Sequence, residues 1–519
     1  MKTLRSYIRG NWHEAKSGFA PLVDPSTEET IAQASSEGID FGAVLDYARE
    51  KGGPALRALT FVQRAALLKE MSKVLRDHRD ELLAISTRNT GTTTPDGSFD
   101  VDGASGTLAY YFAIGKTLGD RTFLTEGDGV QLAKTEGFYG RHILVPKPGV
   151  AVHINAFNFP AWGFAEKAAC ALLAGMPVIT KPATATSMVT ERAVELIVEA
   201  GFLPEGALQL IIGSTGDLLD RLGPQDVLAF TGSADTARGL RSRANLLAAN
   251  TRVNVEADSL NAAVLAPDVA DGSPTFGLFV KDVVREMTQK TGQKCTAVRR
   301  ILVPRDRVDA VQEALIGKLS NVVVGNPQDP SVRMGPVATA QQLKDTVEGI
   351  QELTQGAKIV HGTGQRTDGV GAPEGKGYFV QPTLLRADDA RKAGPVNHRE
   401  VFASVATLLP YDGTAGEAAE IVALGGGTLV TSAYTDDAAW AGDFVTRGGG
   451  ETGRIYIGSE GSIGDAPGSG AALPQTLHGG PGRAGGGEEL GGLVGVKLYL
   501  QRVAVQGSKS LVDGLVGGA

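Results

Sequence analysis

A cysteine on a polar turn is the residue of this chain best suited to nucleophilic chemistry. Cys295 closes the segment GQKC of residues 292–295, where the preceding residues are polar and a glycine favours a turn. A thiolate in such a setting can attack an electrophilic carbon. The only other cysteine is Cys170, whose small apolar neighbours predict a packed helix and an inert, protonated thiol. Cys295 is therefore the candidate nucleophile, although a cysteine without context is more often a small core residue.

The composition limits the class of protein. A chain of 519 residues is long enough for two or three domains, each with its own core. Two cysteines without CxxC spacing exclude a disulfide framework, and seven scattered histidines form no metal-binding pair, so we expect no metal. The net charge of −8 argues against nucleic acid or a membrane as the main partner. Without a secretory signal or a window of ~20 apolar residues, the chain is expected to be cytoplasmic.

The elements that must position Cys295 begin with an alternation of strand and helix patterns. A buried-strand run at residues 149–154, a helical stretch at 161–174 and a second run at 177–181 predict a parallel unit. The alternation predicts a doubly wound open sheet with its ligand site at the carboxyl ends of the strands. It continues with helices at 187–200, 215–222 and from 234, and with strands at 208–212, 227–231 and 252–256.

Other regions carry packing more than chemistry. Residues 41–90 repeat apolar positions at helical spacing, and residues 123–144 alternate as a hairpin that could project and pair with another subunit. A second α/β region runs over residues 259–470, with candidate strands at 300–303 and 405–409.

Six motifs occur in an order that resembles the aldehyde dehydrogenase superfamily. They are NAFNFP at 155–160, TKPA at 180–183, FTGS at 230–233, Glu256, GQKC at 292–295 and EVF at 400–402. The resemblance covers essentially the whole chain. It implies an α/β fold with three parts. These are a Rossmann-type open-sheet cofactor domain at 1–122 and 145–258, a catalytic α/β domain at 259–478, and a small β bridging or oligomerisation element at 123–144 and 485–519, used in a homodimer.

The resemblance also implies catalytic roles. A Cys295 thiolate would attack an aldehyde, and the Asn158 side-chain amide with the Cys295 backbone N–H would stabilise the oxyanion. Glu256 would then act as the general base that hydrolyses the thioester. Alone, Asn158 could equally be a turn-capping residue, and Glu256 a solvated carboxylate at a strand end. Residues 256–261, EADSLN, depart from the Glu-Leu-Gly-Gly-Lys usual in the family, and the interval to Cys295 is longer than typical.

Lys167 has the family's spacing from Asn158 for a lysine that faces the catalytic pocket. Its ammonium could assist Glu256 or lower the pKa of the thiol. The alternative is a surface lysine whose stem packs while its charge stays in water.

A nicotinamide cofactor is implied, with NADP favoured and NAD weaker. In the family, the lysine at the position of Lys181 reaches the adenosine ribose, and NAD-preferring members often have a glutamate three residues later. Thr184 stands there instead, and a hydroxyl tolerates a 2′-phosphate that a carboxylate would repel. Thr184 could also be a plain turn residue. Other implied cofactor contacts are Ser214, Gly232 and Ser233 near the phosphates, and Glu400 and Phe402 at the nicotinamide ribose and ring.

For the substrate, residues 153–187 and 478–490 resemble the semialdehyde dehydrogenases of aerobic aromatic degradation through CoA thioesters. A CoA-linked semialdehyde is the implied partner, with a carboxylic acid as product. An enzyme that passes the acyl group to free CoA is a second interpretation, and a catalytically silent homologue is a third. Glu488 and Glu489 could approach the substrate funnel, but a solvated pair on a loop is the expectation.

Overall fold

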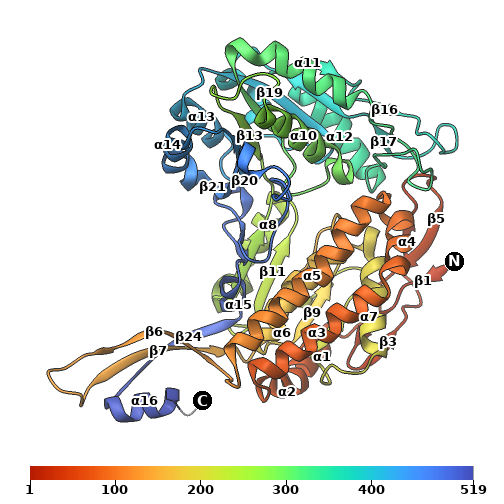
Figure 1. Cartoon of the computed structure of the whole chain (residues 1–519). Coiled ribbons are helices and arrows are strands. Elements are labelled where there is room, and N and C mark those ends of the chain that lie inside the picture. Colours follow the sequence, from red (N-terminus) through yellow and green to blue (C-terminus); the bar gives the residue numbers. More distant parts are fainter. Residues whose placement is uncertain (518–519) are drawn as a thin grey trace.

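Two seven-stranded sheets organise the chain, and the computed structural model describes residues 1–517 (Figure 1). The first sheet has the order β12-β11-β8-β9-β10-β2-β3 and is parallel from β12 to β10. It confirms the predicted doubly wound open sheet. Its strands are β2 (Ser6–Ile8), β3 (Asn11–His13), β8 (Ala151–Ile154), β9 (Val178–Lys181), β10 (Leu208–Leu210), β11 (Val227–Thr231) and β12 (Arg252–Glu256).

Successive side chains along these strands point to opposite faces of the sheet, and each face has its own hydrophobic core. Ala151 and Val178 face one core with helices α3, α5 and α6, whereas Val152 and Ile179 face another with α1, α8 and α9. The helices on the two faces are α1 (Phe41–Tyr47), α2 (Gly53–Arg57), α3 (Phe61–Asp77), α4 (Arg79–Thr90), α5 (Thr94–Leu118), α6 (Trp162–Ala174), α7 (Ser187–Glu199), α8 (Ala234–Arg241) and α9 (Ala244–Ala249), with the π-helix η1 (Ala48–Gly52) and the short 3-10 helix η2 (Thr184–Thr186).

The predicted helix at 215–222 is wrong in extent. The structure has only the 3-10 helix η3 (Leu218–Arg221) there. Gly216 adopts φ of +46°, and a Cβ on it would lie 2.3 Å from the Phe41 ring. This left-handed glycine breaks the regular helix that the residue pattern suggested.

The second sheet, order β15-β18-β19-β14-β13-β20-β21, is parallel except for β15. Helices α10 and α11 share a core on one face, and α12, α13 and α14 share a core on the other. Its strands are β13 (Ala262–Leu265), β14 (Arg300–Pro304), β15 (Lys358–His361), β18 (Thr383–Arg386), β19 (Val405–Tyr411), β20 (Thr428–Tyr434) and β21 (Thr452–Gly458), and its helices are α10 (Pro274–Thr288), α11 (Val308–Leu319), α12 (Ala340–Leu353), α13 (Ala415–Ala423) and α14 (Ala438–Gly448).

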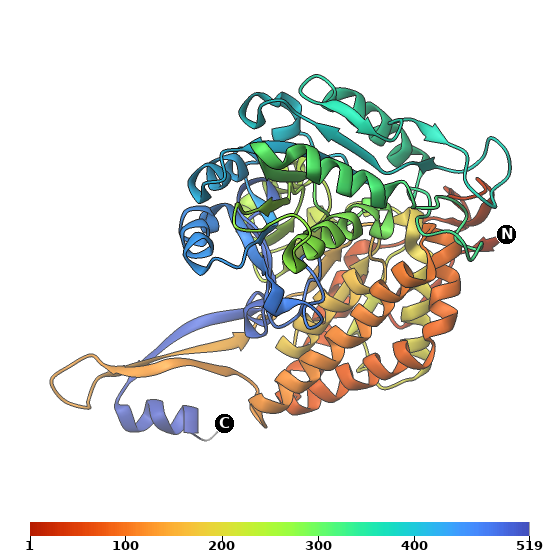
Figure 2. The ribbon, with the colours of Figure 1, turned by 45° about the horizontal axis from the view of Figure 1, so that its top comes forward.

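A long ribbon projects from the body, as expected for residues 123–144 (Figures 1 and 2). It consists of β6 (Leu124–Gln131), β7 (Tyr139–Pro146) and β24 (Leu500–Gly507), with α16 (Lys509–Gly517) alongside. The segment before β24 does not belong to this sheet. Instead, the hairpin of β22 (Leu477–Gly479) and β23 (Glu488–Leu490), with α15 (Leu493–Lys497), packs against the cofactor sheet and α6.

Three small elements complete the description. A sheet of β1 (Lys2–Thr3), β4 (Ala20–Val23) and β5 (Thr30–Ala34) lies near the amino terminus, and β16 (Arg366–Thr367) pairs with β17 (Phe379–Val380). Across residues 1–517, no helix has the length and apolar character needed to cross a membrane.

Candidate active site

Two cavities meet at the Cys295 thiol. One, of about 520 Å³, is lined in part by aromatic side chains and by residues of α6. The other, of about 1310 Å³, runs past the carboxyl ends of β11 and β12. A small substrate in the first cavity and an elongated cofactor in the second would meet at the sulfur. The side chains that line both are Ala156, Asn158, Thr231, Glu256 and Cys295.

The turn that carries Cys295 has an unusual backbone. Just after α10, Lys290, Thr291 and Gly292 have φ of 52°, 58° and 68°. A Cβ on Gly292 would lie 2.3 Å from the carbonyl oxygen of Ala403, so both the angle and the space require glycine. The two non-glycine residues each cost about 1–3 kcal/mol in this region. The surrounding structure must hold the turn in place.

Arg299 supplies much of that support. It is buried, and its guanidinium donates to the carbonyl oxygens of Gly292 at 2.9 Å and Ala403 at 2.7 Å. Its Nε lies 3.3 Å from Oε1 of Glu400. Arg299 therefore ties the nucleophile turn to the segment expected to hold the nicotinamide ribose.

Asn158 lies beside the nucleophile turn. One N–H of its amide donates to the carbonyl oxygen of Gln293 at 3.0 Å, which leaves the second N–H for an oxyanion. In the part of the chain that the structure describes, the Cys295 backbone N–H has no backbone acceptor. Asn261 fixes the following peptide by donating to the Cys295 carbonyl oxygen at 2.7 Å. The oxyanion role of Asn158 stays a prediction, with both donors near the same cavity.

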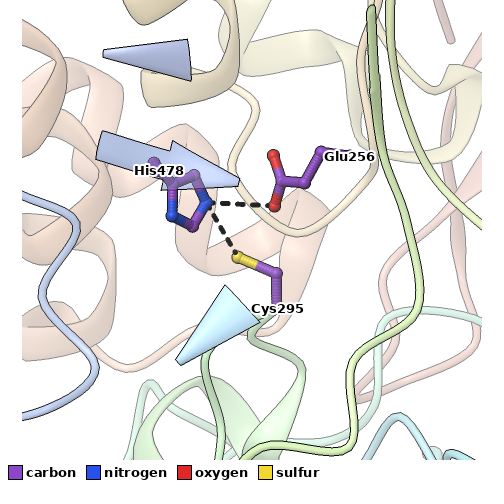
Figure 3. Close-up of side chains that lie close together, drawn as sticks. All are labelled: Glu256, Cys295 and His478. Atoms are coloured by element: carbon purple, nitrogen blue, oxygen red, sulfur yellow. Dashed lines mark hydrogen bonds and ion pairs between the residues drawn. The ribbon is translucent and has the colours of Figure 1, made fainter. Parts of the chain in front are cut away.

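Glu256 and Cys295 are joined by a third side chain, His478 (Figure 3). Its Nε2 lies 3.1 Å from Oε1 of Glu256 and 3.7 Å from Sγ of Cys295. His478 sits on β22, Glu256 ends β12, and Cys295 follows α10, so three distant segments converge. The other carboxylate oxygen of Glu256 lies 3.4 Å from the Thr231 hydroxyl.

The charges of this trio depend on one another. Burial favours a protonated Glu256, but the charge and hydrogen bond of His478, with the charge of Lys167, lower its pKa to about 2. Burial opposes a charge on His478, but Glu256 raises the pKa of that imidazole above its ordinary value. Burial and the charge of Glu256 raise the pKa of Cys295 well above its ordinary value. The resting site therefore favours an ion pair of Glu256 with His478.

Lys167 is a buried member of a carboxylate cluster. Its Nζ lies 2.9 Å from Glu166 and 3.1 Å from Glu489, and only 3% of the residue is exposed, so the surface alternative is wrong. The expectation of a solvated pair is also wrong for Glu489, which is buried and accepts from Asn254 at 3.0 Å. Burial raises the pKa of Glu489 to about 7, while Lys167 lowers it. Glu488 is exposed, as expected.

Cys170 lies on α6 and belongs to the hydrophobic core. It is buried, and burial raises the pKa of its thiol to about 12. Because the thiolate is the nucleophile, this cysteine is unreactive at neutral pH.

Glu400 and Phe402 line the larger cavity, and their place beside a nicotinamide ring stays a prediction. Phe402 packs edge-on against Phe157 with centroids 5.8 Å apart. Glu400 accepts from the Ser259 backbone N–H at 3.1 Å, and burial raises its pKa to about 7 despite the opposing charge of Arg299.

Lys181 ends β9 and is largely shielded from water. Burial lowers its pKa, and in residues 1–517 no carboxylate forms an ion pair with it. The Thr184 hydroxyl donates to the Gly213 carbonyl oxygen at 3.3 Å. Ser214 is exposed and accepts from the Gly216 N–H at 3.1 Å. These residues line neither of the two cavities that meet at Cys295, so their cofactor roles stay predictions.

Gly232 and Ser233 do line the larger cavity, at the start of α8. The expected free amides are partly in use, because the Ala234 N–H donates to Asp258 at 2.9 Å and the Thr236 N–H to Ser233 at 3.3 Å. Asp258 stands where the family usually has glycine. A pyrophosphate here would have to compete with this carboxylate.

The grouping of Glu256, Cys295 and His478 also bears on the expectation that the protein binds no metal. The ligand atoms of Glu256, Cys295 and His478 all lie within 4.8 Å of one another, a spacing that a cation could bridge. Nε2 of His478 already contacts the Glu256 carboxylate directly at 3.1 Å. The absence of a metal stays a prediction.

Two site residues were missed by the reasoning from sequence. His478 is one histidine in a glycine-rich segment, and only the β22–β23 hairpin brings it to Glu256. Arg299 stands in a basic pair ahead of a strand, a pattern that suggests a surface. Neither has a local motif that distinguishes it.

Comparison with known proteins independently supports the family resemblance seen in the sequence. The profile described as the aldehyde dehydrogenase family matches residues 12–505. The 3,4-dehydroadipyl-CoA semialdehyde dehydrogenase of Aromatoleum evansii is 47% identical over 478 residues, which cover 92% of this chain and 93% of that protein.

Solved structures share the fold at lower identity. A 3,6-anhydro-L-galactose dehydrogenase in complex with NAP superposes with a TM-score of 0.85 at 23% identity, covering 98% of this chain and 100% of that one. The lactaldehyde dehydrogenase of Escherichia coli superposes with a TM-score of 0.85 at 24% identity, covering 97% and 99%.

Proposed function

Because the chain belongs to the aldehyde dehydrogenase family and is therefore an aldehyde-oxidising enzyme, we propose that it converts a CoA-linked semialdehyde to the carboxylic acid with NADP. The substrate proposed is 3,4-dehydroadipyl-CoA semialdehyde, in aerobic degradation of benzoate. The relative that is 47% identical carries that name, which supports the choice. A cytoplasmic location stays a prediction.

The observation that carries the proposal is the convergence of both cavities on Cys295. The sulfur attacks the aldehyde carbon, while the Asn158 amide and the Cys295 N–H hold the developing oxyanion. A bound NADP would supply the hydride acceptor. The residues present suit a nicotinamide cofactor, since Glu400 and Phe402 line the larger cavity and Lys181 offers a shielded cation.

Glu256 favours hydrolysis over acyl transfer to free CoA. Its carboxylate lines the same cavities as the thiol and can take a proton from a water that attacks the thioester. An enzyme that hands the acyl group to CoA has no use for a base at this position. The product is therefore proposed to be an acid.

Replacement of Thr184 with glutamate should reverse the cofactor preference. The new carboxylate could pair with Lys181 and would repel a 2′-phosphate, so kcat/KM with NADP should fall by about 10- to 100-fold, the size expected for one charged contact. Activity with NAD should be retained or rise. Thr184→Gln is the matched control, because it adds similar bulk without charge. Unchanged preference for NADP in Thr184→Glu would remove Thr184 from the cofactor site.

The substrate cavity supports a slender acyl chain. Phe99, Phe159 and Trp162 pack edge to face with centroids 5.3 to 5.9 Å apart along its wall. Phe99 and Trp162 also line a third, outer cavity of about 530 Å³. We propose that the acyl chain runs past Phe99 and Trp162, which line both cavities, while the CoA portion stays outside.

A panel of free and CoA-linked semialdehydes tests the proposed function. With NADP, the CoA-linked compounds should show the higher kcat/KM, and mass spectrometry should find a carboxylate whose new oxygen comes from labelled water. Formation of a second CoA thioester only in the presence of free CoA would establish the acylating alternative. Equal rates for free aldehydes of the same chain length would refute recognition of CoA.

The projecting ribbon supports a homodimer. Val130 and Val503 expose apolar side chains on its strands, and Leu132 and Phe138 do so in the loop between β6 and β7. We propose that the bridging element consists of residues 123–146 and of the chain from Leu500 onward, a narrower carboxyl-terminal part than the sequence suggested.

A further inference from the structure

We propose that His478 is a catalytic residue that changes protonation between the two halves of the reaction. As an imidazolium it stabilises the Cys295 thiolate during attack, and as a neutral imidazole it leaves Glu256 basic enough for hydrolysis. The inference deepens the proposed function and rests on its hydrolytic chemistry.

The geometry places one nitrogen between nucleophile and base. His478 Nε2 lies 3.1 Å from the Glu256 carboxylate and 3.7 Å from the Cys295 sulfur, and the residue is 5% exposed (Figure 3). In the described part of the chain, the side-chain partners of the ring, Glu256 and Cys295, both contact Nε2, and the ring lines the substrate cavity. Nδ1 can therefore exchange a proton with water in that cavity while Nε2–H stays on Glu256.

The neighbouring charges make both protonation states accessible. Glu256 and Glu166 favour the imidazolium, whereas burial and Arg454 oppose it. The thiol needs a nearby cation, because burial and the negative charge of Glu256 raise its pKa. The charged groups facing His478 are Glu256 at the end of β12, Glu166 on α6, Arg454 on β21 and Glu489 on β23.

The first half of the reaction uses the charged form. Cys295 loses its thiol proton to cavity water and regains one from water after turnover. The thiolate, beside the imidazolium, forms the sulfur–carbon bond, and loss of the aldehyde hydrogen as hydride, for which a bound nicotinamide would be the acceptor, leaves a neutral thioester. The thioester no longer needs a positive partner. His478 then releases its Nδ1 proton to cavity water, which accounts for one of the protons that the oxidation produces.

The second half needs the neutral form. Paired with an imidazolium, Glu256 is a poor base, since the charge and hydrogen bond of His478 lower its pKa. With His478 neutral, the Glu256 oxygen near Thr231 can take a proton from water as the new carbon–oxygen bond forms. The carbon–sulfur bond breaks, and the thiolate leaves. The proton on Glu256 passes through water to Nδ1, which restores the starting ion pair, and the product acid ionises.

The test measures the reactivity of Cys295 in the absence of substrate. Full-length wild type and His478→Gln, with and without NADP, are treated with iodoacetamide between about pH 6 and 10, and the Cys295 peptide is quantified by mass spectrometry. Glutamine retains an N–H for Glu256 but cannot carry charge. The rate at neutral pH should fall by about tenfold or more, as each unit of pKa changes the thiolate fraction tenfold. The pH dependence of hydrolysis in rapid-mixing experiments should also lose its His478 limb.

His153→Gln is the matched control. His153 is also buried, and its Nε2 forms a hydrogen bond with the Tyr499 hydroxyl at 3.1 Å. It lines neither cavity. Its alkylation profile should match that of wild type. An unchanged profile in His478→Gln would overturn the proposal, whatever the substrate proves to be. Should that variant fail to fold, wild type alone decides: two inflections in its alkylation profile support the proposal, and one inflection at the thiol contradicts it.

Discussion

Replacing Glu256 with glutamine is expected to stop the enzyme after one turnover. Attack by Cys295 and hydride transfer do not need the carboxylate, so a burst of NADPH equal to the number of active sites should form. Hydrolysis does need it, and steady-state turnover should fall by about 10²- to 10⁴-fold, the usual contribution of a general base. Glutamine keeps the volume of the side chain, which limits the change to its basicity.

Rapid-mixing absorbance at the NADPH band measures both phases in one experiment. Glu488→Gln is the control, because Glu488 is exposed and lies outside the cavity, so both phases should match those of wild type. Parental steady-state turnover in Glu256→Gln would mean that another group activates the water, and Glu166, which lines the substrate cavity, would be the next candidate.

Replacing Cys295 with alanine is expected to abolish both phases. Without the sulfur no covalent intermediate forms, and kcat should fall by at least about 10³-fold, as for other lost nucleophiles. Cys170→Ala should retain activity, since that thiol is buried in α6 with its pKa raised to about 12. NADPH formation by Cys295→Ala at a rate near that of wild type would exclude a thioester mechanism.

Strand and helix periodicity in the sequence predicted most elements of the fold. The predicted strand at residues 227–231 coincides with β11, and the helix predicted at 161–174 nearly coincides with α6. Both elements are long apolar stretches that are buried in the core, and their residue pattern fits only one kind of secondary structure. The helix predicted at 215–222 failed because Gly216 packs against Phe41, a contact between distant segments that periodicity does not contain.

The site was less accessible to such reasoning. Cys295, Glu256 and Asn158 belong to motifs, and the structure places them around two shared cavities. His478 and Glu489 reach the site only because the β22–β23 hairpin folds back over the end of β12. Their neighbours in the sequence are mostly glycines, which predict turns and leave the direction of a side chain undetermined.

The most direct test of the account is the mass of the enzyme during turnover. Wild type mixed with excess CoA-linked semialdehyde and NADP, and quenched in acid within the first turnover, should gain the mass of the aldehyde less two hydrogen atoms, with the added mass on the Cys295 peptide. An active enzyme that shows no such adduct, or one that carries it on Cys170, would contradict the assignment of Cys295 as the nucleophile.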